Sequence, residues 1–191
     1  PIPPAKKALI INSKFGIPGI KPIRSNTPAA GNHALVIPTS WEIWSDKSKF
    51  DEFGLTYPQL INIFTEDGTR LNALITYPHN FDPMNQYPVI LYNYGGPGSQ
   101  LVSNRWGAGN HILHQYFASR DYIIFSFDNR GTGGRGKAFK DLAYGDYGKY
   151  LVKDHIEAAK YLQGLPYVDG DNIGIWGWSG GGYLTNMCMT L

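Results

Sequence analysis

The sequence has little of several features that would place it in a class at once. A single cysteine, Cys188, stands among 191 residues, so an internal disulfide is excluded. No apolar run is long enough to span a membrane, and the first four residues, Pro-Ile-Pro-Pro, resemble neither an initiator nor a signal peptide. A formal charge of +2 is too small to indicate nucleic acid or another polyanion as a partner. With 42% hydrophobic and 17% charged residues, the chain is globular rather than disordered.

Glycine is abundant and unevenly placed. Most of the 23 glycines lie between residues 95 and 182, and they gather in three loops at residues 94–99, 128–136 and 177–182. Each of these loops directly follows an apolar run that reads as a buried strand. Since ligands of α/β proteins meet the carboxyl ends of parallel strands, the three loops mark a candidate active edge.

The order of periodic segments predicts an α/β fold. Alternating residues on both sides of Asp67-Gly68 predict an antiparallel hairpin, and strands and helices then take turns along the chain. Strands are predicted at residues 60–66, 70–77, 87–94, 121–127 and 172–178, and helices at 108–119, 152–162 and 183–191. A polar turn is predicted at 168–171, and residues 137–148 make a poor helix. Before residue 56 the chain reads as a connector, in which Trp41 and Trp44 suit a short strand or turn.

The last glycine-rich loop carries the sequence Gly-Trp-Ser-Gly-Gly at residues 177–181. This G-x-S-x-G pattern between a strand and a helix is typical of the nucleophile elbow of α/β-hydrolases, so Ser179 is the candidate nucleophile. An acyl-transfer site also needs donors for the oxyanion. One is the N–H of Gly180, and the second comes from the loop after residue 93, either from a glycine N–H or from the hydroxyl of Tyr94.

Four motifs occur together in order and at characteristic spacing: residues 94–100, 128–133, 154–159 and 175–183. The set resembles the prolyl oligopeptidase family of serine peptidases, and its dipeptidyl peptidase IV branch most closely. The likeness is clear from about residue 64 to residue 191. It implies an α/β-hydrolase fold in which residues 56–191 are the N-terminal part of the catalytic domain, and residues 1–55 are a connector or the exit from a β-propeller of the same chain.

The resemblance also implies the roles of the site residues. Ser179 would be the nucleophile, with the Tyr94 hydroxyl and the Gly180 N–H as oxyanion donors. Short peptides would be the substrates, no cofactor or metal is implied, and a homodimer in a periplasmic, secreted or membrane-anchored setting is compatible with the family. In the dipeptidyl peptidase branch the position after the serine is often tyrosine, which helps to form the pocket for proline. Here that position is Gly180, so the resemblance does not predict a preference for proline at the cleaved bond.

The triad is the incomplete part of the prediction. In this fold the acid and the histidine follow the serine along the chain, and the sequence stops 12 residues after Ser179. Both are therefore expected beyond Leu191, and the fold is expected to be truncated after the elbow, so that residues 1–191 would be inactive alone. All five histidines precede the serine and are interpreted as surface or packing residues: His33, His79, His111, His114 and His155.

Three other interpretations remain. The elbow alone does not distinguish a peptidase from a carboxylesterase, and a catalytically silent hydrolase-like binding module would carry the same fold. The third is dinucleotide binding, since residues 131–136 satisfy G-x-G-x-x-G and Asp154 lies near the distance of a ribose-binding acid. The poor helix after residue 136 counts against it.

Overall fold

The computed structural model describes residues 9–11, 41–43, 52–104 and 111–190. The chain divides into two compact units, Pro1–Lys49 and Phe50–Leu191, and each is described by itself. In the first unit, β1 (Leu9–Ile11) pairs in antiparallel fashion with β2 (Trp41–Ile43), which includes the first tryptophan of the predicted short strand. Trp44 lies outside the described residues.

The second unit contains a five-stranded mixed sheet in the order β3-β4-β6-β5-β7. The strands are β3 (Gln59–Phe64), β4 (Arg70–Thr76), β5 (Tyr87–Asn93), β6 (Ile123–Phe127) and β7 (Val168–Gly177). The hairpin β3–β4 is antiparallel, β4 joins β6 in antiparallel fashion, and β5 runs parallel to both β6 and β7. An opening hairpin followed by parallel strands is the predicted arrangement, and it is confirmed.

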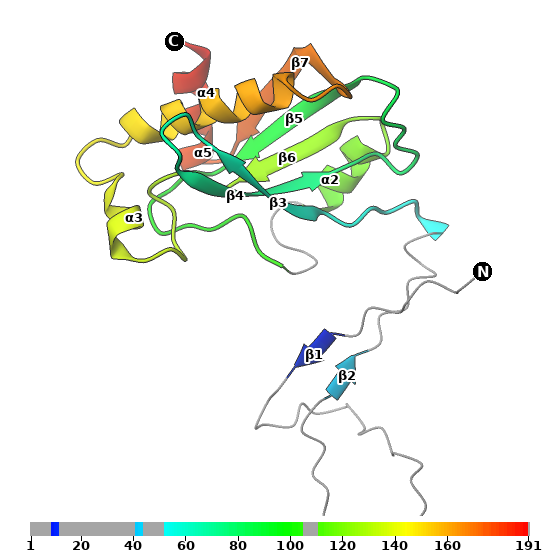
Figure 1. Ribbon diagram of the computed structural model, residues 1–191, viewed down its shortest axis with the longest axis horizontal. Helices are drawn as coiled ribbons and strands as arrows, with labels where there is room; N and C mark the ends of the chain where they lie inside the picture. Colours follow the sequence, from blue (N-terminus) through cyan, green and yellow to red (C-terminus); the bar gives the residue numbers. More distant parts are fainter. Residues whose placement is uncertain (1–8, 12–40, 44–51, 105–110, 191) are drawn as a thin grey trace, which may run out of the picture. The chain divides into compact units, whose positions relative to one another are not determined.

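Helices cover both faces of this sheet, as Figure 1 shows. They are α2 (His111–Ala118), α4 (Lys149–Gln163) and α5 (Gly180–Met189), whereas the short helix α3 (Lys137–Asp141) lies to one side of the sheet. Leu91 of β5 belongs to the core cluster that also holds Leu162 of α4. Because side chains alternate along a strand, the next residue, Tyr92, faces the other side, where its ring lies 5.0 Å from that of His114 in α2. Burial on both faces explains why β5 and β6 read as continuous apolar runs. Among the described helices, none combines the length and the apolar character that crossing a membrane requires.

Two local predictions are corrected by the structure. The polar residues predicted to form a turn at 168–171 lie inside β7, because Val168 pairs with Tyr87 at the start of the parallel ladder. A register shift between Tyr87 and Val89 accommodates the extra residues. In the region predicted to be a poor helix, the five-residue helix α3 forms at 137–141, although it buries none of its side chains.

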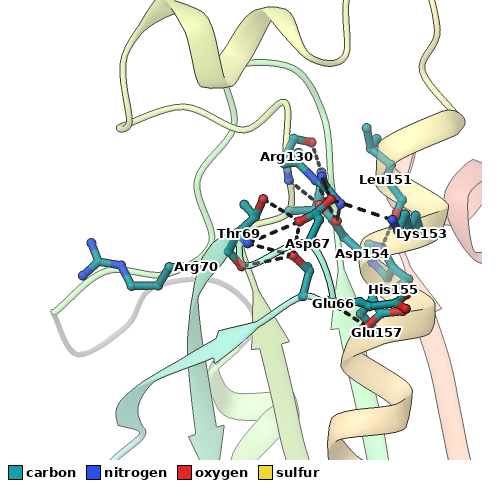
Figure 2. A network of polar contacts seen from close by, with 12 residues as sticks. Glu66, Asp67, Thr69, Arg70, Arg130, Leu151, Lys153, Asp154, His155 and Glu157 are labelled. Carbon is teal, nitrogen blue, oxygen red and sulfur yellow. Dashed lines mark hydrogen bonds and ion pairs between the residues drawn. The ribbon is translucent and has the colours of Figure 1, made fainter.

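An ionic cluster, buried at Arg130 and Asp154 and exposed at Asp67, joins three segments that are distant in sequence (Figure 2). The Arg130 guanidinium, in the loop after β6, donates to Asp154 of α4 from Nε at 2.9 Å and from a terminal nitrogen at 2.5 Å. Its other terminal nitrogen donates to Asp67 in the hairpin turn at 2.7 Å. Hydrogen bonds from two neighbouring threonines and from Arg130 hold the pKa of the Asp67 carboxyl well below its usual range. Since Asp154 is fully buried, its charge requires this partner, and the cluster fixes the loop against the helix.

One turn of α4 also carries a histidine that is buried in the core. The Nδ1–H of His155 donates to the Leu151 carbonyl at 2.7 Å, whereas its Nε2 is buried without a hydrogen-bond partner. Burial lowers the pKa of His155 from 6.5 to about 4. Protonation would place a charge and an unpaired N–H beside the ring of Phe127, whose centroid lies 4.6 Å away.

We therefore expect His155 to make stability fall in acid. Because the folded-state pKa lies below the unfolded value, its contribution is complete above about pH 6.5 and is lost as the pH falls towards 4. A pKa difference of this size corresponds to roughly 3 kcal/mol. The measurement is the thermal unfolding midpoint of the whole protein at pH 7 and pH 4.5, compared with His155→Gln. Glutamine keeps a donor for Leu151 but does not titrate, so an equal acid shift in both proteins would contradict the expectation.

Candidate active site

Ser179 lies at the sharp turn between the end of β7 and the start of α5. Its backbone has φ 53° and ψ −116°, and its side chain makes no capping hydrogen bond to the helix. A positive φ in a residue other than glycine is strained and is retained where the surrounding structure enforces it. The residue is exposed, so the turn presents its hydroxyl to solvent at the carboxyl end of the sheet.

Glycine flanks this serine because the backbone of β5 passes directly against the turn. A Cβ on Gly177 would lie 2.5 Å from the carbonyl oxygen of Asn93 and 2.6 Å from the carbonyl carbon of Gly181. A Cβ on Gly181 would lie closer still to the same oxygen. Real Cβ atoms are not found at such distances from backbone, so both positions of the G-x-S-x-G pattern accept hydrogen alone as a side chain.

The loop that carries Tyr94 begins at this contact. The Cα atom of Tyr94 lies 3.0 Å from the Cβ position of Gly181, and its carbonyl oxygen lies 3.6 Å from that of Gly180. The structure therefore brings the three predicted residues, Tyr94, Ser179 and Gly180, into one small region. The side chain of Tyr94 is partly exposed at the same edge of the sheet.

Asn93 supports the turn and was not singled out by the sequence. Its side chain is buried, and its Nδ2 donates to the Trp176 carbonyl at 3.2 Å and to Thr185 Oγ1 at 3.1 Å. It thereby joins β5, β7 and α5 around Ser179. The one available signal was a polar residue at the end of an otherwise apolar run, and polar groups buried at such a position require partners.

The two glycine-rich loops at 94–100 and 128–136 bond to each other. The N–H of Gly133 donates to the Ser99 carbonyl at 2.7 Å, and the N–H of Gly98 donates to the Gly131 carbonyl at 3.3 Å. The Ser99 hydroxyl donates to the Gly96 carbonyl at 2.6 Å within its own loop. The glycines allow this close approach, since a Cβ on Gly133 would lie 2.7 Å from the carbonyl oxygen of Gly98.

A buried carboxylate fixes the end of the first of these loops. Asp128 accepts hydrogen bonds from the N–H of Leu101 at 2.7 Å and from the N–H of Val102 at 3.3 Å. Burial raises the pKa of Asp128 to about 6. Asp128 begins the motif at residues 128–133, but its contact with the loop at 101–102 is visible only in the tertiary structure.

The N–H of Gly180 lies at the N-terminal end of α5. Gly180 is the first residue of α5, and the first N–H groups of a helix have no acceptor within it. The following N–H, of Gly181, donates to the Trp178 carbonyl at 2.9 Å, and that of Tyr183 donates to the Ser179 carbonyl at 3.1 Å. The positive end of the helix dipole lies at the same place.

The described histidines belong to segments other than this turn. His79 is in the segment between β4 and β5, His114 packs on Tyr92, and His155 is in the core of α4. His33 and the side chain of His111 lie outside the described part of the chain. Asp154 is buried against Arg130, which leaves it poorly placed for the ribose of a dinucleotide.

Comparisons with known proteins identify relatives of this chain. The sequence model of the prolyl oligopeptidase family matches residues 111–191. A protein of Emericella nidulans named "Probable dipeptidyl peptidase 4" is 40% identical over 140 residues, which cover 72% of this chain and 18% of that protein. A "Probable dipeptidyl-aminopeptidase B" of Ajellomyces capsulatus is 45% identical over 128 residues, covering 66% and 13%. The chain thus spans less than a fifth of the length of these relatives.

The chain is also similar to a protein of known structure. The crystal structure of Porphyromonas gingivalis dipeptidyl peptidase 4 superimposes with a TM-score of 0.68 at 36% identity, over 78% of this chain and 22% of that one. The mixed sheet with helices on both faces is the α/β-hydrolase fold of such enzymes. By its motifs, its fold and these relatives, the chain belongs to the prolyl oligopeptidase family, in the branch that resembles dipeptidyl peptidase IV.

Proposed function

We propose that this chain is part of a serine peptidase that cleaves short peptides in the manner of a dipeptidyl peptidase. The observation that carries the proposal is the exposed serine at φ 53° between a strand and a helix, with the backbone of Tyr94 packed against the same turn. Two proteins that the chain resembles are named as dipeptidyl peptidases or aminopeptidases, and this agrees with an amide as the bond that is cut.

In the proposed mechanism, the Ser179 hydroxyl attacks the carbonyl carbon of the scissile bond. A base takes its proton, and the carbonyl oxygen becomes an oxyanion as the tetrahedral intermediate forms. The Gly180 N–H, which has no acceptor within α5, and the Tyr94 hydroxyl donate to that oxygen. As the intermediate collapses, the protonated base gives its proton to the leaving amine, and an acyl group remains on Ser179. The base then takes a proton from water, which attacks the acyl carbonyl, and returns that proton to the Ser179 oxygen as the acid is released.

The base and its acid are proposed to come from sequence that follows Leu191, in the chain order of this fold. A β-propeller of the same chain, with residues 1–55 as the connector or its exit, would restrict access to short peptides. Residues 1–191 alone are then expected to be inactive. Fluorophosphonate labelling tests this: the whole protein should label at Ser179, and rapid stoichiometric labelling of residues 1–191 alone would contradict the proposal.

Tyr94→Phe tests the oxyanion role directly. Loss of one preorganised donor is expected to lower kcat about 10²- to 10³-fold with a small change in KM, because the hydrogen bond strengthens only as the oxyanion forms. The measurement is steady-state hydrolysis of a dipeptidyl anilide by the whole protein.

Tyr144→Phe is a matched control for this substitution. Tyr144 lies in the segment between α3 and α4 and is 91% exposed, so loss of its hydroxyl should leave both constants unchanged. Equal kcat and KM in Tyr94→Phe and in the unchanged protein would contradict the proposal that the Tyr94 hydroxyl donates to the oxyanion. An enzyme that hydrolyses simple esters but no dipeptidyl amide would instead be an esterase.

A further inference from the structure

A second phenol stands beside the candidate nucleophile. Tyr147 lies between α3 and α4, more than thirty residues before the elbow in sequence. Its hydroxyl oxygen is 2.9 Å from the position that a Cβ would take on Gly180. The space that a side chain at the position after the serine would enter is therefore occupied by the tip of Tyr147.

The ring of Tyr147 is held in place on one side. It packs against the apolar cluster that includes Leu151 and Leu184, and its centroid lies 5.8 Å from that of Tyr183. Burial raises the pKa of the Tyr147 phenol, and the neighbouring phenols of Tyr94 and Tyr183 add to this effect. The three tyrosines thus gather around the turn from three separate segments of the chain.

The tip of Tyr147 is less constrained than its ring. Within residues 52–104 and 111–190 no hydrogen bond to its hydroxyl is found, and the residue is only partly buried. It therefore offers an apolar ring face and a hydroxyl to whatever binds next to Gly180. Any side chain at position 180 would meet that hydroxyl, which would have to shift to make room for it.

We propose that Tyr147 forms a wall of the pocket that receives the residue whose carbonyl Ser179 attacks, and that it limits the size of that residue. This inference rests on the proposed function, because it places the scissile carbonyl between Ser179 and the Gly180 N–H. The acyl residue then projects from a point beside Gly180, where the Tyr147 ring blocks further extension. Compact apolar residues fit, and bulky ones require the ring to leave the cluster that it packs against.

Shortening the side chain tests this role. The whole protein and the variants Tyr147→Leu and Tyr147→Phe are assayed on two dipeptidyl anilides, one with alanine and one with phenylalanine at the cleaved bond. In Tyr147→Leu, the ratio of kcat/KM for phenylalanine over alanine should rise about tenfold or more, since pocket size alone discriminates by this order. Tyr147→Phe retains the ring, so its ratio should stay within about twofold of the unchanged protein. If Tyr147 had only a structural role, kcat/KM would fall by the same factor for both substrates and the ratio would stay unchanged.

Labelling of Ser179 by a fluorophosphonate separates the two proposals. If Ser179 is labelled and the ratio in Tyr147→Leu is unchanged, the proposal that Tyr147 limits the pocket is contradicted, whereas the proposal that Ser179 is the nucleophile is not. If Ser179 does not label in the unchanged whole protein, the proposed function and the pocket wall both fall. Should Tyr147→Leu not fold, Tyr147→Val is measured in its place with the same expected rise.

Discussion

Ser179→Ala is expected to lower kcat of the whole protein on dipeptidyl anilides by about 10⁴-fold or more. Without the hydroxyl no acyl-enzyme can form, and what remains is the contribution of substrate binding and the oxyanion donors. The substitution should leave the fold unchanged, because the side chain makes no capping hydrogen bond and the residue is exposed. Hydrolysis rates and thermal unfolding midpoints, measured together, check both parts of this expectation.

Ser119→Ala provides the matched serine control. Its hydroxyl donates to the Tyr116 carbonyl at 2.7 Å just after α2, on an exposed part of the helix end. Its loss should leave turnover unchanged, so that the effect at position 179 can be assigned to chemistry. Retention of more than about one per cent of turnover in Ser179→Ala would rule out an acyl-enzyme on this residue.

Gly181→Ala is expected to have the largest effect on folding. The added methyl group would overlap the Asn93 carbonyl oxygen, and the nearest other atoms belong to the backbone of Asn93 and Tyr94. Backbone atoms cannot rotate away as a flexible side chain can, so β5 and α5 would have to separate around a packed core. We expect a loss of about 4 kcal/mol or more, seen as a fall in soluble yield or in the unfolding midpoint.

Gly174→Ala is the control for the loss of a glycine from the same strand. At this position in β7 the nearest atom to an added Cβ is the Val89 carbonyl oxygen, at 3.9 Å, which is an ordinary contact. Gly174→Ala should change the free energy of unfolding by no more than about 1 kcal/mol, because the added methyl group meets no close atom and glycine itself contributes no side-chain packing to a strand. Similar unfolding midpoints for Gly181→Ala and Gly174→Ala would show that β5 does not pass as close to the Ser179 turn as described.

Local patterns were sufficient for most of the sheet. The alternation of residues around Asp67-Gly68 predicted the hairpin, and its strands pair from Gln59 with Ile75 to Phe64 with Arg70. The apolar runs predicted β5 and β6 because burial on both faces removes alternation. Strand ends were less certain, since pairing with a distant partner decided them: Val168 joins β7 only because Tyr87 lies opposite.

In the candidate site, too, the local features could be predicted from the sequence and the contacts between distant segments could not. The motifs pointed to Tyr94, Ser179 and Gly180, because a strand, a glycine-flanked serine and a helix form a local turn that the sequence displays directly. The contacts that hold the neighbouring segments together were not visible in the sequence. Asn93 resembles an ordinary polar residue there. Asp128, Arg130 and Asp154 lie in two of the motifs, but the motifs did not show that Asp128 binds the loop at 101–102 or that Arg130 pairs with Asp154.

The sequence by itself therefore determined the order of the elements, the sharp bend at Ser179 and the family, because these depend on residues that are neighbours along the chain. Tertiary structure alone decided which backbone passes against that bend and that Tyr147 stands next to Gly180. The physical reason is that a close approach of two segments is set by packing of the whole core. Such an approach leaves no periodic pattern in either segment.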